Sequence, residues 1–325
     1  MSKNLSKFKW PLILIILLLV PFLVTSKYNM HLIIMAGIYA IMAIGLDIIM
    51  GYTGQLSLAH QSFYGIGAYV SALLTLRLGW SVWFGMVAAI LATLLVSYLV
   101  GYISLRVRGT TFIILTFSFS GIAHLVALNY VELTNGQMGL SSIPMPSIGG
   151  FTFGSRMSYY YLVLFFLVIT YYIAVRLTKS RLGRSWIGIR ENEILAESLG
   201  VNPFHYSLFA FMIGSSLAGF AGALYAHYTC FVSPENLQFG VVITLLVMVV
   251  LGGKGTIIGP VIGAVIFTVV PEYLRIAEDL RLPIFGILLV ILALYIPKGL
   301  IPFCQDLLAK KRQKKEVPGN EAVRG

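Results

Sequence analysis

The sequence predicts an all-α integral membrane protein of about ten transmembrane helices with both termini in the cytoplasm. Three observations predict this fold class. Hydrophobic residues make up 58% of the 325-residue chain and charged residues only 11%, against roughly 25% charged residues in soluble domains. The apolar residues fall into long runs, and a helix needs about 20 of them to cross a bilayer. Most lysines and arginines lie on one side of the resulting topology.

The first expected helix is an apolar run over 11–26 that follows the basic residues Lys3, Lys7 and Lys9. This start resembles a signal peptide. No clear small-x-small cleavage site follows it, however, and a second apolar run begins almost at once. The run therefore predicts a retained first span rather than a cleaved leader.

The remaining helices follow the same length rule, although two of them are short. In order, the ten expected spans are 11–26, 29–50, 57–76, 83–105, 110–130, 157–177, 204–228, 238–251, 256–273 and 283–297. The connection 131–156 is rich in glycine and proline and is too short for a domain. The membrane domain is expected over 1–309, followed by a basic and disordered cytoplasmic tail over 310–325 near anionic lipid.

The orientation follows from the distribution of lysine and arginine. With the N-terminus in the cytoplasm, 18 of the 23 basic residues lie in cytoplasmic segments. The five on the other side are Lys27, Arg77, Arg156, Arg275 and Arg281. A topology with one span fewer would reverse the later loops and remove this bias.

Composition and missing motifs exclude several classes of function. The net charge of +11 lies in a few loops and both tails, which indicates topology rather than nucleic-acid binding. Cys230 and Cys304 are expected on opposite sides of the membrane, so no disulfide is expected between them. The GGKGT stretch at 252–256 lacks the spacing of a phosphate-binding loop. We expect no catalytic residues, no metal site and no cofactor in this chain.

The stretch GYTGQLSLAHQSFYGIGAYV, residues 51–70, is unusually polar for this chain. Gly51 and Gly54 suit a tight turn, because glycine accepts positive φ. On a helix that begins near Leu56, the side chains of Ser57, His60, Gln61 and Tyr64 would share one face. Gln55 directly precedes this helix and adds a fifth polar side chain. They are expected either to line part of a translocation path or to bond helices together inside the bundle. Both interpretations exclude a lipid-facing position.

Small residues predict close helix packing at two places. Gly65 and Gly67 follow the polar face of the helix expected over 57–76. In the stretch GSSLAGFAGALYA, residues 214–226, two adjacent stripes recur every four residues. They comprise Gly214, Ala218 and Gly222, and Ser215, Gly219 and Ala223. A weak similarity between the loops around Gly51 and Gly252 leaves an internal repeat open.

The longest charged connection is SRLGRSWIGIRENEILAESLGVNPF, residues 180–204. It predicts one amphipathic helix over Trp186–Leu199, with Ile187, Ile194 and Leu195 forming an apolar stripe. Gly200 suits the helix end. The apolar side needs a cover, which could be a partner protein or the lipid interface. A simple connector lying on the membrane is the alternative.

Four stretches together resemble the permease subunits of bacterial branched-chain amino acid ABC importers, and most closely the longer, M-type permease. They are GYTGQLSLAHQSFYGIGAYVSALL, RVRGTTFIILTFSFS, GIRENEILAESLGVNPFHYSLFAFMIGSSLAGFAGALYA and VMVVLGGKGTIIGPVIGAV. The resemblance runs in order over about residues 30–300. One departure is Ala59-His60-Gln61, where Gly-His-Ala or Gly-His-Gly is more usual.

The resemblance implies a type II-like importer architecture and a set of partners. These are a second, related permease, two cytoplasmic ATPases that hold ATP and magnesium, and a periplasmic substrate-binding protein. It also implies a bacterial inner-membrane location and a coupling helix at about 183–200. The coupling residues expected there are Arg190, Glu191, Glu193, Ala196, Glu197 and Gly200.

Two other functions stay open at this stage. Related permeases carry urea or short amides, so an importer of urea or short amides is the first alternative. An ion-coupled secondary carrier is the second alternative, although the expected spans lack the set of buried mid-span carboxylates that such a carrier would need.

Overall fold

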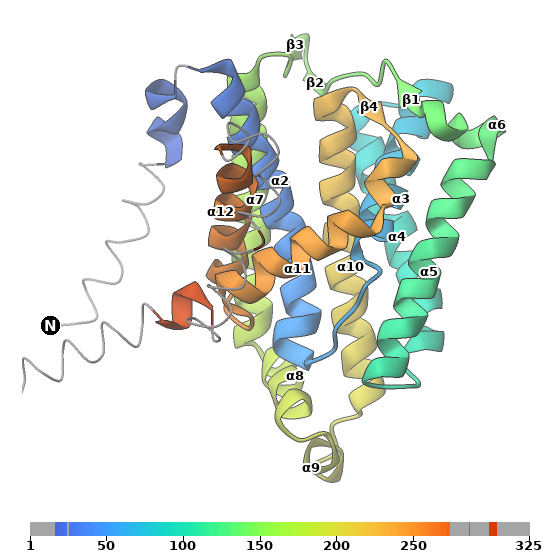
Figure 1. Cartoon of the computed structure of the whole chain (residues 1–325), viewed down its shortest axis with the longest axis vertical. Coiled ribbons are helices and arrows are strands. Elements are labelled where there is room, and N and C mark those ends of the chain that lie inside the picture. The colour runs from blue at the N-terminus through green and yellow to red at the C-terminus, as the bar shows by residue number, and fades with distance from the viewer. Residues whose placement is uncertain (1–16, 25, 274–285, 287–298, 304–325) are drawn as a thin grey trace, which may run out of the picture.

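The computed structural model describes residues 17–24, 26–273, 286 and 299–303, which form a bundle of long helices (Figure 1). Helix α2 (Lys27–Asp47) continues into a π-helical turn, η1 (Ile48–Thr53). Gly54 ends this turn with φ +78°, a left-handed conformation that glycine adopts without strain. Residues 55–59 are not helical, and α3 (His60–Arg77) begins only after them.

The next elements carry the chain along one side of the bundle and over its end. Helices α4 (Val82–Ser104) and α5 (Thr110–Asn129) form a hairpin. The loop that follows contains α6 (Val131–Thr134), η2 (Gly136–Met138), β1 (Leu140–Ser141), β2 (Ser147–Ile148) and β3 (Phe151–Thr152). Strands β2 and β3 pair antiparallel, with Ser147 opposite Thr152.

The second half adds the long charged connection, two helices of membrane length and two shorter apolar helices. Its elements are α7 (Arg156–Lys179), α8 (Arg181–Glu191), α9 (Glu193–Ser198), α10 (Pro203–Thr229), β4 (Phe231–Val232), η3 (Pro234–Leu237), α11 (Phe239–Gly253) and α12 (Ile258–Tyr273). Strand β4 pairs antiparallel with β1, with Leu140 opposite Val232. The short strands therefore lie at one end of the bundle, and α8 and α9 at the other (Figure 1).

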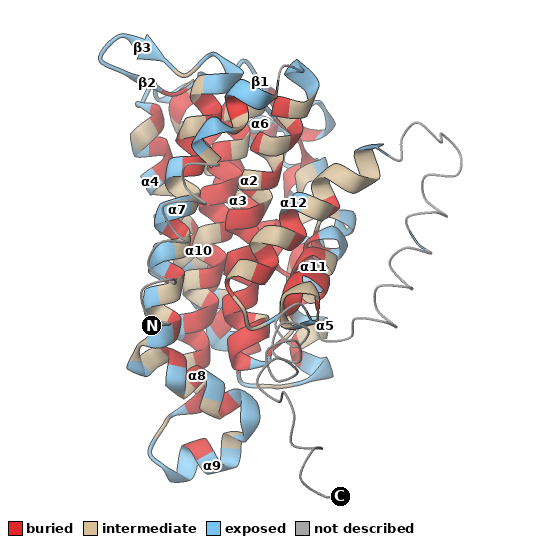
Figure 2. Ribbon diagram, turned by 90° about the vertical axis from the view of Figure 1, so that its left-hand side faces the viewer, coloured by how far each residue is buried: buried red, intermediate tan, exposed pale blue. Residues whose placement is uncertain are grey.

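Burial separates the helices of the bundle into inner and outer ones. The most apolar windows of α2–η1 and α10 are 83% and 72% buried, whereas those of α4, α5 and α7 are between 22% and 33% buried. The buried residues accordingly run along the centre of the molecule (Figure 2). Apolar side chains face outward on the peripheral helices, as expected for surfaces that meet lipid or another membrane subunit.

The described residues support a membrane bundle but not a count of ten spans. Five helices are long and apolar enough to cross a membrane: Lys27–Thr53, Val82–Ser104, Thr110–Asn129, Arg156–Lys179 and Pro203–Thr229. Helix α3 has 18 residues but is not among them, and α11 and α12 have only 15 and 16 residues. The span expected at 283–297 lies outside the described residues except for position 286, as do residues 11–16 and 25 of the first expected span and all of 310–325.

Two sequence-based predictions of helices are wrong in detail. The helix expected from near Leu56 begins at His60, so Ser57 does not share its face. The single helix expected over Trp186–Leu199 is two helices, because the extended backbone of Asn192 (φ −158°) breaks it. Asn192 then caps α9, its Oδ1 accepting a hydrogen bond from the Leu195 N–H at 3.0 Å.

Candidate functional site

Two glycine-rich turns meet at the α8–α9 end of the bundle. Asp47, the last residue of α2, is completely buried, and its Oδ1 accepts a hydrogen bond of 2.7 Å from the Gly255 N–H. A Cβ atom at Gly51 would lie 2.1 Å from Asp47 Oδ1 and 2.4 Å from Gly255 N. The glycine at position 51 therefore allows the turn after α2 to contact the α11–α12 turn.

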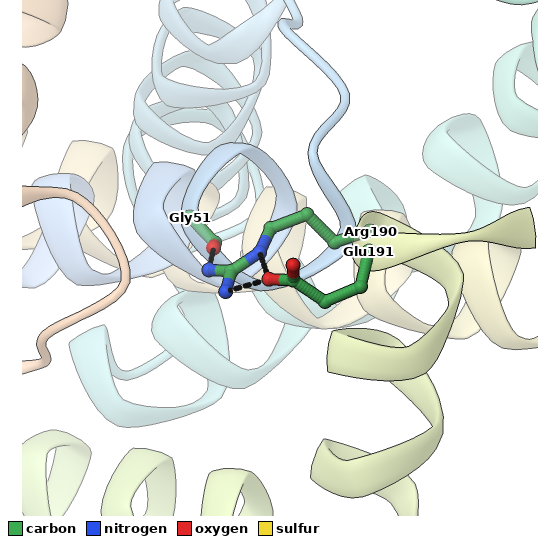
Figure 3. Close-up of polar contacts among 3 residues, drawn as sticks. All are labelled: Gly51, Arg190 and Glu191. Carbon is green, nitrogen blue, oxygen red and sulfur yellow. Dashed lines mark hydrogen bonds and ion pairs between the residues drawn. The ribbon is translucent and has the colours of Figure 1, made fainter.

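Arg190, in the last turn of α8, lies against the same turn (Figure 3). Its Nη1 donates a hydrogen bond of 2.6 Å to the Gly51 carbonyl oxygen, while Nη2 and Nε donate to Glu191 Oε1 at 2.6 and 3.2 Å. A Cβ atom at Gly54 would lie 2.9 Å from Arg190 Cγ. A movement of α8 would therefore displace the turn over 51–54 through these contacts.

The rest of α8 is anchored in the bundle, whereas α9 projects from it (Figure 2). Trp186 is fully buried, and its Nε1 donates to the Tyr206 carbonyl oxygen at 2.9 Å. An ion pair between Arg108 and Glu193 ties the start of α9 to the α4–α5 connection. The α8–α9 segment is thus attached to the bundle at both of its helices.

The outer surface of this segment combines apolar side chains with exposed carboxylates. Ile194, Leu195 and Leu199 are 81%, 57% and 76% exposed. Ala196 is buried, Glu197 is exposed, and Gly200 has φ +85° with no atom near the place of a Cβ. Such a surface favours contact with another protein, because water alone leaves its large apolar side chains uncovered.

All five residues expected to line a path are buried: Gln55, Ser57, His60, Gln61 and Tyr64. The structure does not bring them together on one surface. Gln61 donates from Nε2 to Ser120 Oγ of α5. His60 instead faces α10, since a Cβ atom at Gly214 would lie 3.3 Å from its Nε2. The ring of Tyr64 lies 5.6 Å from that of Tyr225.

Several polar atoms of this buried segment have no hydrogen-bond partner among the described residues. They are both amide atoms of Gln55, both ring nitrogens of His60, Oε1 of Gln61 and the hydroxyl of Tyr64. Leaving a buried polar group unpaired costs roughly 1–3 kcal/mol, so such groups need a further explanation. Water or a passing polar solute would supply the missing partners.

A cavity of about 440 Å³ opens at the opposite, β-strand end, and it does not include any of these five residues. Its lining includes His31, Arg156, Tyr159 and Tyr228. His31 Nδ1 and the Tyr228 hydroxyl are 2.8 Å apart. This polar opening is therefore separate from the segment 55–64.

The small residues lie where helix backbones approach each other. A Cβ atom at Gly67 would lie 2.1 Å from the Gly219 carbonyl oxygen, and one at Gly222 would lie 1.8 Å from that of Tyr64. Ala218 is fully buried in the same helix. An added Cβ atom would also meet the Gly45 carbonyl oxygen at Gly214, the Thr93 side chain at Gly219 and the Leu237 side chain at Gly65.

His227 connects the membrane helices to the loop at the β-strand end. Its two ring nitrogens lie 2.7 Å from Ser71 Oγ and 2.7 Å from the Pro144 carbonyl oxygen. Because a carbonyl can only accept, Nδ1 donates to Pro144 and Nε2 accepts from the Ser71 hydroxyl. The sequence placed His227 at the end of a span but did not indicate either partner.

We expect His227→Ala to destabilise this end of the protein by about 1–3 kcal/mol, because it leaves the buried Ser71 hydroxyl and the Pro144 carbonyl unpaired. Thermal unfolding of the purified chain in detergent should shift downward, and proteolysis within 131–156 should accelerate. Ser118→Ala is the matched control, since the exposed Ser118 bonds only to Ile114 of its own helix. Equal stability of the two variants would contradict the assigned role.

Sequence reasoning missed the partners that organise the α8–α9 end. Asp47 lies near the end of the expected span 29–50, but no local pattern indicates its contact with Gly255, which is 208 positions away in the sequence. The Trp186 bond to Tyr206 and the Ser120 bond to Gln61 were equally invisible. The one feature of the sequence that could have pointed to these contacts is that a polar or aromatic residue interrupts an apolar or small-residue pattern at each position.

Comparisons with known proteins agree with this architecture. Residues 29–293 match the family described as "Branched-chain amino acid transport system / permease component". The chain is 34% identical to the permease LivM of Salmonella typhimurium over 92% of this chain and 76% of that protein. It is 33% identical to LivM of Escherichia coli K12, over 90% of this chain and 74% of the relative.

A second kind of permease is also related. The chain is 27% identical to LivH of Escherichia coli K12 over 81% of this chain and 91% of that protein. No solved structure matches. The family match, the two LivM relatives and the membrane-length apolar helices show that this chain is a multi-pass membrane protein belonging to the family of permease components of branched-chain amino acid transport systems.

Proposed function

We propose that this chain is one permease subunit of an ATP-driven importer that carries leucine, isoleucine and valine across a bacterial inner membrane. The relatives LivM and LivH are both described as high-affinity branched-chain amino acid permeases. The proposed complex contains a second, related permease, two ATPases that hold ATP and magnesium, and a periplasmic protein that delivers the substrate. This chain itself holds no cofactor and hydrolyses nothing.

The observation that carries the proposal is the connection from α9 through Arg190 to the turn over 51–54. In the proposed mechanism, ATP binding closes the two ATPases, and their surface moves the α8–α9 segment. Arg190 passes this motion to Gly51, whose turn leads directly into the polar segment 55–64. The bundle would alternate between an outward-open and an inward-open state, and ATP shifts this equilibrium only if the complex binds it with different affinity in the two states.

The proposed topology has ten spans, a type II-like arrangement and both termini in the cytoplasm. The alternating directions of α2, α4, α5, α7 and α10 support this topology. Lys27 and Arg156 begin α2 and α7 at the β-strand end, where basic residues are expected to be few. Arg108, in the α4–α5 connection with Arg106, pairs with Glu193 of α9. Lys254 precedes Gly255, whose N–H binds Asp47 at the α8–α9 end of the bundle. The excess of basic residues at the latter end assigns it to the cytoplasm.

Affinity purification of the tagged chain from its native membrane is the decisive experiment. We expect one second permease and two phosphate-loop ATPases to co-purify with it, and the reconstituted complex to take up leucine only with ATP. Reversing the charges in Glu191→Arg plus Glu197→Arg should release the ATPases and stop uptake, while the second permease remains bound. The two residues expose carboxylates on the proposed docking surface.

Glu132→Arg is the control, because it reverses an exposed carboxylate at the β-strand end. It should leave the ATPases bound. A chain that purifies alone, or uptake that depends on an ion gradient rather than on ATP, would favour a secondary carrier. ATP-dependent uptake of urea or a short amide, with no uptake of leucine, would correct the substrate and leave the class unchanged.

A further inference from the structure

The segment 54–59 is non-helical at a depth where a membrane surrounds the bundle. His60 follows it and lies against Gly214, which is 11 residues from the start of α10. At 1.5 Å per residue, this contact is roughly 16 Å along that helix. The segment therefore extends from the end of η1 toward the middle of the bundle, beside α5 and α11 (Figure 1).

Three residues of this segment reach the outer surface of the described bundle. Gly54 is exposed, and Leu56 and Leu58 are partly exposed. Side chains accept from only two of its N–H groups in the described structure: Thr116 Oγ1 from Leu58 at 3.1 Å, and Ser57 Oγ from Ala59 at 3.3 Å. Lipid offers no hydrogen bonds, so irregular backbone at membrane depth must be covered by protein or water.

The surroundings of this segment are apolar, which argues against water as the cover. Ile114 and Phe117 of α5 are 57% and 46% exposed, and Phe239 and Ile243 of α11 are 44% and 46% exposed. The rings of Phe117 and Phe239 lie 5.0 Å apart. Phe117 follows Thr116, the residue that binds the Leu58 N–H. We call Leu56, Leu58, Ile114, Phe117, Phe239 and Ile243 the α5–α11 face.

We propose that the α5–α11 face binds the second permease of the complex, an inference that rests on the proposed function. Irregular backbone at this depth excludes lipid as its cover, and the large apolar side chains disfavour water, so protein is the cover that suits this face. The six residues carry no charge, as suits an interface inside a membrane. Escherichia coli has both a LivM and a LivH related to this chain, so a related permease is the membrane partner that the comparisons offer for this face.

Gln55 lies in the same segment, between Gly54 and Leu56, and both atoms of its side-chain amide are buried and lack partners among the described residues. The segment 54–59 would form part of the boundary between the two permeases.

Photo-crosslinking in the complete, co-expressed complex tests the proposal. We would place p-benzoylphenylalanine separately at Leu58, at Phe117 and, as a control, at Leu95, which is 63% exposed on α4. Phe117 is the safer site for folding, because the probe retains its phenyl ring. After illumination, Leu58 and Phe117 should each give an adduct that contains peptides of the second permease. The adduct should be absent with the probe at Leu95.

Three results would overturn the assignment while leaving the importer intact. The first is a permease adduct at Leu95 but at neither test site. The second is crosslinking to phospholipid from Leu58 or Phe117. The third is rapid labelling of Leu58→Cys by a membrane-impermeant thiol reagent in the assembled complex, with Cys230 and Cys304 replaced by serine. If no second permease co-purifies at all, the proposed function itself fails.

Discussion

Adding one methyl group at Gly222 should prevent this protein from accumulating in a folded form. The Cβ of Gly222→Ala would lie 1.8 Å from the Tyr64 carbonyl oxygen and 3.1 Å from the Ala68 N atom. Both atoms belong to the backbone of α3, so no side chain can rotate away. The helices α3 and α10 would have to separate, and we expect a cost of about 3 kcal/mol or more, the upper range for over-packed cores.

The measurement is the yield and thermal unfolding of the purified chain in mild detergent. Gly67→Ala, on the facing helix, should behave in the same way, because its Cβ would lie 2.1 Å from the Gly219 carbonyl oxygen. Gly121→Ala provides the control, since Gly121 is also in a helix but has no atom within 4 Å of the added carbon. Full yield and unchanged unfolding of Gly222→Ala would show that α3 and α10 pack less closely.

Removing the Arg190 side chain should separate ATP hydrolysis from transport. Arg190→Ala deletes the charged donor to the Gly51 carbonyl oxygen and the side chain that contacts Gly54. Hydrogen bonds to charged groups contribute roughly 1.5–3 kcal/mol, and each 1.4 kcal/mol corresponds to about tenfold in an equilibrium. We therefore expect uptake to fall by at least about tenfold, while ATP hydrolysis by the complex continues.

Two further variants make this result specific. Arg190→Lys retains the charge but not the planar fork that bonds Gly51 and Glu191 together, so it should recover only part of the uptake. Arg184→Ala removes another arginine of α8, whose side chain makes no hydrogen bond or ion pair with any described residue, and should transport normally. All three variants should still co-purify with the ATPases. Wild-type uptake by Arg190→Ala would rule out this route of coupling.

The periodicity of the sequence predicted the long helices well and their interruptions poorly. The runs 83–105, 110–130, 157–177 and 204–228 correspond closely to α4, α5, α7 and α10, since an apolar run of membrane length has few alternatives to a helix. The turn at Gly51 and Gly54 was predicted but not the non-helical stretch that continues to residue 59, and the break at Asn192 was not predicted. Each depends on contacts with distant residues, Thr116 for the first and Arg108 for the second.

The sequence by itself determined that this chain is a membrane bundle, that small residues bring its helices together, and that its charged connection lies between two spans. These properties follow from local composition, because lipid requires each span to satisfy its own backbone. Only the tertiary structure decided that the turns around Gly51 and Gly255 meet and that Arg190 binds the first of them. It also separated His60 from Gln61, which lie on different sides of α3 and contact different helices. Partners so far apart in sequence are chosen by how the whole bundle packs, and no local pattern encodes that choice.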